Sequence, residues 1–488
     1  MGYELSLKAR VLRGSLWSLA GGSGQQLIAF LTFLYLAKVL DARAVGIVAS
    51  AAILSDLTVI FAKLGLVEAI QRHDPDHDLE TAAWWCSAIS GLAGAVLIVL
   101  ASFLVGRLTN QPEIANVLLI LSPVALLSAA TAIPEGLIRR SLKFRALSIR
   151  TWISTIAGGA AAIVAVSLDY GLYALAIQRL VTSFIGSVMI WLQAGWRPGG
   201  FSNFRSAAHL VRAGFMIVIG SFSGIVNARI SDAITALFLG SGPLGYLRLA
   251  SRFSDVIVQM LVVPVVSVAL PSFASVKNDP AAMRRSYLRL TQFMAIVAIP
   301  AYFGLGAIAE PFIRALLGEK WLGALVAFQF FGFGITAGCV NYFFSPLMVS
   351  MGRADIVMKQ SVTQIILAIP LVWAGAHYGV TGVVLAGIIR ASIVSIMNTI
   401  VIVKLLSVRA RSIVFQWAPP FISSLAMFAA CKLLLAQLSG SSDYVQCAAG
   451  IALGVVVYAV VLTLGDYIGI WHGYVRNGLA SLKGGLRP

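Results

Sequence analysis

The stretch from Asn227 to Gly240, NARISDAITALFLG, places Arg229 and Asp232 three positions apart in a run that is otherwise almost wholly apolar. On a helix this spacing puts both side chains on one face. A guanidinium forms charge-assisted, bidentate hydrogen bonds with a carboxylate and equally well with a phosphate. Two roles are therefore open to this pair: an internal ion pair, or part of an anion-binding site.

Other charged residues lie equally deep in apolar segments. Asp56 precedes Lys63 by seven positions, and Arg252 precedes Asp255 by three, so each pair shares a helix face. Asp56 and Asp255 follow predicted outer helix ends by ten residues, which is about 15 Å of helix. An ionised group at that depth costs at least about 2.5 kcal/mol unless it is paired or hydrated. We expect these charges to face a bundle interior or an aqueous cavity, with Asp56 and Asp255 as candidates for proton or ion coupling.

Arg179 and Arg390 have no acidic residue in their own apolar segments. If both point into a central cleft together with Arg229, that cleft is net cationic. Arginine offers planar, bidentate and permanently charged recognition, which suits phosphate or pyrophosphate. The alternative is that the buried charges form ion pairs within one half of the molecule and touch no substrate, and this alternative stays open here.

Uncharged polar residues give a weaker signal. Gln25, Gln26 and Asn341 are candidates to donate hydrogen bonds to sugar hydroxyls, although hydrogen bonds between helices would explain them equally well. The motif RHDPDHD (72–78) has metal-ligand residue types, but a solvated turn explains it more simply. Phosphate-loop, HExxH and GxSxG motifs are absent from the sequence. We therefore expect no catalytic residues, no metal and no cofactor, and a protein that is not an enzyme.

The elements that position these residues are membrane-spanning helices. The chain has 488 residues, of which 59% are hydrophobic and 11% are charged, too few polar side chains to cover a soluble globule. Apolar segments of about 20 residues match the hydrocarbon thickness as helices. We predict an all-α polytopic membrane protein with fourteen spans near 14–39, 45–68, 83–106, 115–137, 149–168, 171–194, 211–239, 246–273, 287–308, 323–350, 358–377, 381–406, 416–437 and 446–469.

The basic residues orient these spans. With the N-terminus in the cytoplasm, 24 of the 36 Lys and Arg fall on the cytoplasmic side and 8 on the opposite side. This bias predicts that both termini are cytoplasmic. It also accounts for the net charge of +17, because basic loops face anionic lipid headgroups, so we expect no nucleic-acid partner.

A weak internal repeat divides the chain. GIVASAAILSD (46–56) and GYLRLASRFSD (245–255) share Gly, Ala, Ser and Asp at a constant offset of 199 positions. The offset equals six spans, an even number, so the two copies enter the membrane in the same direction, as in transporters built from parallel repeats. We predict a six-helix N-lobe (1–195), a cytoplasmic linker (196–209), a six-helix C-lobe (210–410), and two additional helices with a cytoplasmic tail (411–488).

These residues resemble a known family. NARISDAITALFLGSGPLGYLRLASRF is similar to the signature of helices seven and eight in Wzx-type polysaccharide transporters, and LRGSLWSLAGGSGQQ, LAKVLDARAVGIVASA and SDLTVIFAKLGLVEAIQR resemble the first two helices of that family. Arg229 and Asp232 match its basic and acidic positions in helix seven, and Arg252 matches one in helix eight. The turn GYLRLAS lacks the second aromatic residue that is commoner there, and two helices exceed the usual twelve.

The resemblance implies a member of the multidrug/oligosaccharidyl-lipid/polysaccharide (MOP) exporter superfamily with a MATE-like fold. Such a flippase moves oligosaccharide linked to undecaprenyl pyrophosphate across the bacterial inner membrane for exopolysaccharide or surface polysaccharide synthesis. Its partners would be membrane lipids and a polysaccharide polymerase or export complex. We expect alternating access, with the pyrophosphate on Arg229, Arg179 and Arg390.

Three other functions are weighed against this one. A cation-coupled, MATE-like exporter of small molecules predicts an acidic cavity. A membrane-embedded polymerase or glycosyltransferase predicts a large external loop or an acidic sugar-nucleotide motif, and the sequence has neither. A structural partner in an envelope complex is the third.

Overall fold

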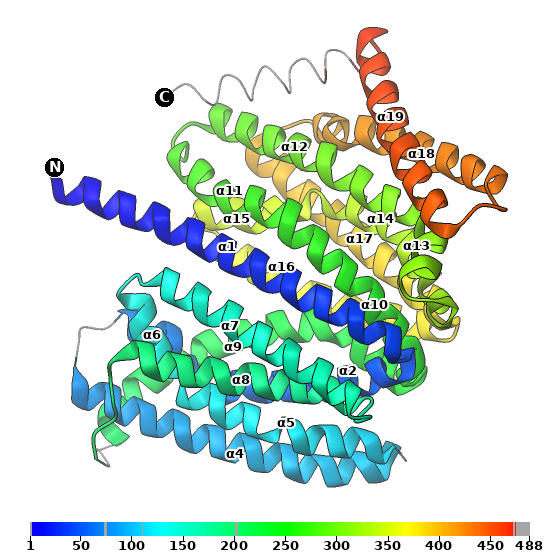
Figure 1. Ribbon diagram of the computed structural model, residues 1–488. Coiled ribbons are helices and arrows are strands. Elements are labelled where there is room, and N and C mark those ends of the chain that lie inside the picture. The colour runs from blue at the N-terminus through cyan, green and yellow to red at the C-terminus, as the bar shows by residue number, and fades with distance from the viewer. Residues whose placement is uncertain (1, 73–75, 110, 201–203, 472–473, 475–488) are drawn as a thin grey trace. The chain divides into compact units, whose positions relative to one another are not determined.

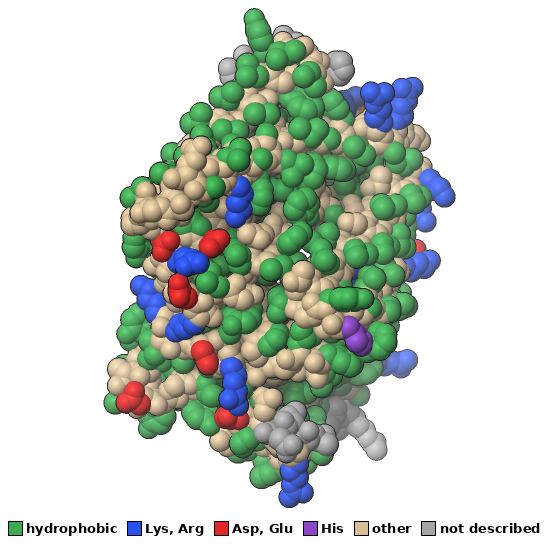
Figure 2. All heavy atoms as spheres, turned by 90° about the vertical axis from the view of Figure 1, so that its right-hand side faces the viewer, with side chains coloured by type: hydrophobic (Ala, Val, Ile, Leu, Met, Phe, Trp, Pro, Cys, Tyr) green, Lys and Arg blue, Asp and Glu red, His purple; other side chains and the backbone are tan. Residues whose placement is uncertain are grey.

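A computed structural model describes residues 2–72, 76–109, 111–200, 204–471 and 474. Within these residues the chain forms helices and no strands, and fourteen helices are long and apolar enough to cross a membrane. The predicted all-α class and the predicted number of spans are confirmed. The outer surface is correspondingly apolar: Leu192, Leu237 and Leu433 are 69–79% exposed, and Figure 2 shows hydrophobic side chains over most of one face, with charged side chains in a few groups. These features define a multi-pass membrane protein.

Contacts divide the chain into two compact units, residues 1–248 and 249–488. The first unit contains these helices: α1 (Gly2–Val39), α2 (Ala42–Ala62), α3 (Leu66–Ala69), α4 (His77–Thr109), α5 (Pro112–Ala130), α6 (Ala132–Arg140), α7 (Phe144–Ser167), α8 (Tyr173–Ala194), α9 (Phe204–Phe238) and the first eight residues of α10 (Ser241–Ile257). Helices α4 and α5 run side by side, as do α7 and α8 (Figure 1). Helix α9 packs against α2, α3 and α4.

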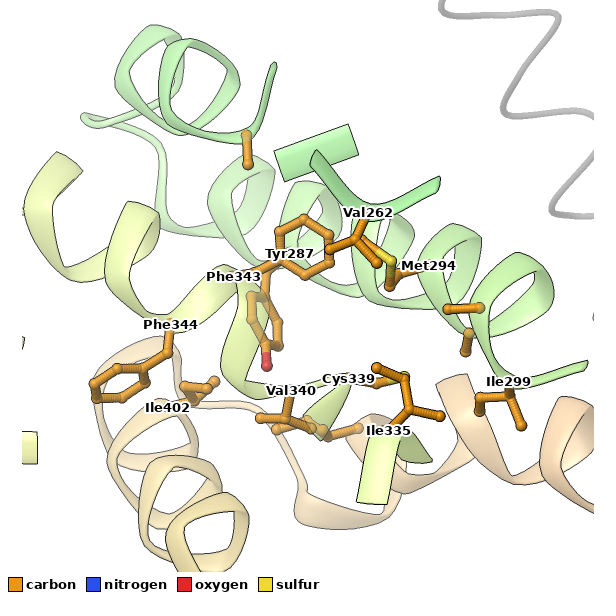
Figure 3. Close-up of a cluster of buried hydrophobic side chains, with 14 of the residues drawn as sticks. Val262, Tyr287, Met294, Ile299, Ile335, Cys339, Val340, Phe343, Phe344 and Ile402 are labelled. Carbon is orange, nitrogen blue, oxygen red and sulfur yellow. The ribbon is translucent and has the colours of Figure 1, made fainter. Parts of the chain in front are cut away.

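The second unit contains the rest of α10 and these helices: α11 (Val263–Ser275), α12 (Pro280–Ala307), α13 (Ala309–Leu316), α14 (Leu325–Gly338), α15 (Asn341–Ser350), α16 (Ala354–Ala376), α17 (Gly379–Leu406), α18 (Ala410–Gln437) and α19 (Asp443–Tyr467). Its buried core gathers aromatic and aliphatic side chains from α12, α15 and the junction of α14 with α15, among them Tyr287, Phe343 and Val340 (Figure 3). The helices α18 and α19 pack on each other, and α18 packs on α12.

The compact units do not coincide with the predicted lobes. Helix α9 was expected in the C-lobe, yet it belongs by contact to the first unit. Packing groups helices by what they touch, whereas a repeat groups them by sequence, so the boundaries at 195 and 210 stay a prediction. Residues 201–203 of the expected linker and 475–488 of the expected tail lie outside the described residues.

Four predicted spans are not continuous α-helices. The span predicted at 45–68 is interrupted at residues 63–65, between α2 and α3. The span predicted at 115–137 is interrupted at Thr131, between α5 and α6, and the span predicted at 323–350 is interrupted at Cys339–Val340. The span predicted at 246–273 contains a π-helical turn, Val258–Val262. Three of these four irregularities precede a proline in the same span, at Pro134, Pro346 and Pro264. Proline has no N–H and its ring clashes with the carbonyl four residues earlier, so kinks are expected there.

Side chains satisfy several carbonyls that prolines leave free. A backbone carbonyl without a partner is costly in lipid, and neighbouring side chains commonly provide the missing donor. The carbonyl four residues before Pro123, Pro134, Pro300 and Pro420 accepts, respectively, from Ser122 Oγ (2.8 Å), Trp84 Nε1 (2.9 Å), Tyr458 OH (2.8 Å) and Tyr474 OH (2.5 Å). At each of these four prolines a side chain therefore donates to the carbonyl that proline cannot pair.

The two copies of the repeat meet in a reciprocal contact within the first unit. A Cβ atom added to Gly46 would lie 1.7 Å from the carbonyl oxygen of Ser241, and one added to Gly245 would lie 1.8 Å from that of Ala42. Ser241 follows Ala42 by 199 positions, the same offset that separates Gly245 from Gly46. A reciprocal contact of this kind is what a two-fold axis between equivalent elements produces. Glycine is required at both positions because the backbones of α2 and α10 touch.

Candidate functional site

Asp56 joins two arginines from two other helices. It lies in α2, and its Oδ2 accepts a hydrogen bond of 2.9 Å from Nη2 of Arg229 in α9. Its other oxygen, Oδ1, accepts from Nη2 of Arg179 in α8. One carboxylate thus pairs with two guanidinium groups.

A second carboxylate continues the series. Asp232 in α9 accepts a hydrogen bond from Arg248 in α10, and its Oδ2 lies 3.8 Å from Nη1 of Arg229. The five residues Arg179, Asp56, Arg229, Asp232 and Arg248 therefore form a continuous line of alternating charge, which we call the charge chain. All five belong to the first unit.

Helix geometry explains why these residues reach one another. Arg179 lies six residues into α8 and Arg248 seven residues into α10, which is about 9 and 10 Å from the helix starts. Asp232 lies six residues before the end of α9, again about 9 Å. With the predicted orientation, these helix ends all lie at the outer surface. The charge chain therefore begins well inside the apolar part of the bundle.

The charge chain carries an excess of positive charge. Three arginines and two aspartates sum to a formal charge of +1. Arg179 and Arg229 are each 30% exposed, whereas Asp56 and Asp232 are 15% and 14% exposed. The guanidinium groups are thus the more accessible members, and a guanidinium has five N–H donors to share between carboxylates and another acceptor.

The structure corrects two expected pairings. Arg179 has no acidic residue in its own helix, as predicted, but it is not a lone cation, because Asp56 of α2 pairs with it. Lys63 does not pair with Asp56. It lies 3.5 Å from Oε2 of Glu135 in α6, because it caps the far end of α2, about 10 Å along the helix from Asp56.

Arg248 was missed as a site residue. The predicted span 246–273 contains it, but it was counted among the eight basic residues on the outer side; it lies in the second turn of α10. A signal did exist: Asp232 and Arg248 are each eight residues from Gly240, which turns the chain with a φ of +86°. Residues equidistant from a tight turn between antiparallel helices lie at the same height, so this pair could have been predicted.

The remaining candidates lie apart from the charge chain. Arg252, Asp255 and Arg390 belong to the second unit, where Arg252 and Asp255 are exposed and Arg390 is half-buried. In the first unit, Gln25 is exposed and Gln26 is half-buried on α1. These five stay predictions as binding or coupling residues.

Asn341 takes part in a contact between helices, and its role in binding stays a prediction. Its Oδ1 accepts a hydrogen bond of 2.7 Å from Nδ2 of Asn398 in α17, which is the contact between helices that the alternative interpretation expected. In the RHDPDHD motif, residues 73–75 lie outside the described residues. Among the residues that are described, no three His, Cys, Asp or Glu side chains gather closely enough to hold a metal ion.

A second group of charges lies at the other end of the first unit. Glu135 is buried and lies within 4.0 Å of Lys63, Arg139 and Arg150, while Glu80 pairs with Arg140 at 2.9 Å. Burial raises the pKa of Glu135, but the charges of Lys63, Arg150 and Arg139 outweigh burial and hold that pKa at about 2. The ion pairs of Glu135 therefore stabilise the packing of α6 against the end of α2 and against α7.

The fold is similar to that of solved transporters of the MOP type. The fold of this chain is similar to that of the lipid II flippase MurJ, solved in an inward-closed conformation. The TM-score is 0.73 at 15% identity, and the match covers 94% of this chain and 100% of that one. An inward-facing multidrug resistance MATE transporter of the MOP superfamily is similar with a TM-score of 0.57, at 15% identity, over 81% of this chain and 94% of that one.

The sequence gives the family. Residues 35–326 match the family model described as "Polysaccharide biosynthesis protein", and the chain belongs to this family. It is 25% identical to the lipopolysaccharide biosynthesis protein WzxC of Escherichia coli, over 86% of each chain. It is 24% identical to the succinoglycan biosynthesis transport protein ExoT of Rhizobium meliloti, over 93% of each chain. The resemblance to Wzx-type transporters of the MOP superfamily is confirmed.

Proposed function

We propose that this protein is a flippase that carries oligosaccharide linked to undecaprenyl pyrophosphate from the inner to the outer leaflet of the bacterial inner membrane. The observation that supports it most is the charge chain, a line of paired charges with one excess positive charge inside an apolar bundle. Membership of the polysaccharide biosynthesis family and similarity to the transport protein ExoT and to the flippase MurJ agree with it.

The charge chain would bind the pyrophosphate by exchange of partners. Arg229 donates to Asp56 and lies near Asp232, so an incoming pyrophosphate oxygen can replace a carboxylate oxygen without leaving the guanidinium unpaired. Protonation of Asp56 would weaken its hold on Arg179 and Arg229 and so couple transport to a proton gradient. Arg252, Arg390, Gln25, Gln26 and Asn341 are proposed to add contacts to the headgroup and glycan, and Asp255 to act in coupling.

The cycle we propose is alternating access. The headgroup and glycan enter from the cytoplasm, the polyprenyl tail stays in lipid, and a rearrangement of the lobes exposes the headgroup on the outer side. No covalent bond changes, so the protein acts as a transporter and not as an enzyme. Both termini are proposed to be cytoplasmic, and a polysaccharide polymerase or export complex to receive the product.

A cation-coupled exporter of small molecules is the weaker alternative. The MATE transporters share the fold, but this function predicts an excess of acidic residues in the binding cavity. The charge chain has the opposite excess, with three arginines against two aspartates.

Transport by the purified protein tests the proposal. Lipid vesicles containing the protein and a labelled undecaprenyl-pyrophosphate oligosaccharide should show translocation that protein-free vesicles lack. We expect Arg229→Ala to lower the rate by at least about tenfold, since a charged hydrogen bond contributes about 1.5–3 kcal/mol. Arg43→Ala, which removes an exposed arginine paired with Glu113, is the matched control and should leave the rate unchanged. Wild-type translocation in the Arg229→Ala protein would contradict the proposal.

A further inference from the structure

A groove in the second unit is lined by α15, α16 and α17. Its volume is about 460 Å³, and most of its lining is apolar, including Phe344, Ile356, Met397, Ile400 and Val401. Met397 and Ile400 are 43% and 49% exposed, so the groove opens on the outer surface of the bundle. An apolar groove on the surface of a membrane-spanning helix bundle is accessible to a lipid chain.

The groove is confined to one half of the membrane. Helix α16 begins at Ala354 and α17 ends at Leu406, both at the end that the charge bias assigns to the cytoplasm. The lining residues farthest from these ends are Thr363 and Val394, which lie about 14 and 18 Å along their helices. The hydrocarbon core is about 30 Å thick, so the groove has the depth of one leaflet. A long polyprenyl chain needs more depth than this, whereas an acyl chain of the inner leaflet fits.

A basic side chain lies at the end of the groove nearest the predicted cytoplasmic surface. Lys359 lines it and is 76% exposed, about 8 Å from the start of α16. Its nitrogen lies 3.9 Å from Oδ2 of Asp355, an exposed pair that leaves the ammonium accessible. Arg353 precedes α16 and Lys404 lies in the last turn of α17, both exposed at the same end. Basic residues between helices on the cytoplasmic side favour anionic headgroups.

We propose that this groove binds an anionic phospholipid of the inner leaflet, with one acyl chain against Met397 and Ile400 and its phosphate at Lys359. The groove has basic residues at its cytoplasmic end and apolar residues deeper in the membrane. A phospholipid has the same order, with its charged headgroup at the surface and its acyl chains below. Two polar residues lie deeper in the groove, and each already has a partner within the protein: Thr363 Oγ1 donates to the carbonyl of Lys359, and Asn398 Nδ2 donates to Oδ1 of Asn341.

Native mass spectrometry of the purified full chain tests the proposal. The protein in detergent is mixed with equal amounts of phosphatidylglycerol and phosphatidylcholine that have identical chains. We expect the wild type to retain one phosphatidylglycerol in about fivefold preference, the size of effect expected for one basic residue at the headgroup level. Lys359→Gln should abolish the preference, Lys359→Arg should keep it, and Ile400→Trp should lower retention of both lipids by filling the groove.

Two control variants separate the groove from the general surface. Lys277→Gln removes another exposed lysine of the second unit, and Val455→Trp enlarges an exposed side chain on α19; both should behave as wild type. Equal retention of the two lipids by the wild type, or equal effects of Ile400→Trp and Val455→Trp, would overturn the proposal. Displacement of phosphatidylglycerol by equimolar undecaprenyl phosphate would overturn it too, by assigning the groove to the transport substrate. Binding is measured without transport, so the result is independent of the proposed flippase activity.

Discussion

At the scale of single residues, Asp56 is the acceptor on which the charge chain depends. Among the described residues it is the only ion-pair partner of Arg179, and it also accepts a hydrogen bond from Arg229. Both arginines belong to membrane-spanning helices, where a charge without a partner is costly. The carboxylate therefore stabilises the packing of α8 and α9 against α2, besides any part it has in transport.

We expect Asp56→Asn to destabilise the protein by about 1.5–3 kcal/mol, the range for hydrogen bonds to charged groups. The double variant Asp56→Asn/Arg179→Gln should recover part of this loss, because it removes one of the two stranded cations. The measurement is the free energy of unfolding in detergent. Glu113→Gln, which breaks the exposed pair with Arg43, is the control and should cost less than about 1 kcal/mol. Strictly additive losses in the double variant would show that Asp56 and Arg179 are not coupled.

Glu135 gives a prediction about pH. Its pKa of about 2 in the folded protein lies below its ordinary value of 4.5, so its contribution to stability is present above about pH 4.5 and is lost as the pH falls toward 2. Glu135→Gln should therefore lower the unfolding temperature at pH 7, and the gap to wild type should narrow below pH 4.5. A gap that stays constant from pH 7 to pH 3 would mean that the carboxylate charge does not stabilise the fold.

Residue spacing predicted part of the site. The depth of Asp56, Arg229 and Asp232 follows from counting residues along helices, since the rise per residue is fixed. The pairing of Asp56 with Arg179 could not be predicted in this way, because it joins α2 to α8 and depends on how each helix is rotated about its axis. That rotation is set by the packing of whole helix faces, so it cannot be inferred from the spacing of two residues in the sequence.

At the scale of elements, the spans were predictable and their interruptions were not. Length and hydropathy identify a span wherever it packs, so fourteen predicted spans match fourteen observed ones among the described residues. A kink needs a donor for the carbonyl that proline frees, and that donor comes from elsewhere in the chain. Trp84, for example, serves the carbonyl of Ala130, 46 positions away.

The carbonyl that Pro300 leaves without a backbone donor tests this account of the elements. Tyr458→Phe removes the hydroxyl that donates to the carbonyl of Ile296, and we expect a loss of about 1–3 kcal/mol because a buried acceptor is left unsatisfied. In a Pro300→Ala background the backbone N–H of residue 300 becomes available to the same carbonyl. The loss caused by Tyr458→Phe should then fall below about 1 kcal/mol. Equal losses in both backgrounds, measured by unfolding in detergent, would refute the compensation.

At the scale of the whole molecule, the parallel repeat was predictable from a single recurring offset. The offset of 199 positions that relates Gly46 to Gly245 also relates Ala42 to Ser241, and these four residues form the reciprocal backbone contact between α2 and α10. The glycine of the repeat recurs at 46 and 245 because the close backbone contact leaves no room for a side chain at either position. The division into units at residue 248 was not predictable, since it depends on which helices α9 touches.

We propose that the charge chain selects the headgroup of the substrate, and transport of matched lipids tests this claim most directly. The measurement compares translocation of one oligosaccharide carried on two polyprenyl lipids, one with a pyrophosphate linkage and one with an uncharged linkage, in vesicles with wild-type or Arg229→Gln protein. We predict that the wild type moves the pyrophosphate-linked lipid at least about tenfold faster, and that the preference disappears in Arg229→Gln, since one charged contact contributes about 1.5–3 kcal/mol. An undiminished preference in the Arg229→Gln protein would contradict the account.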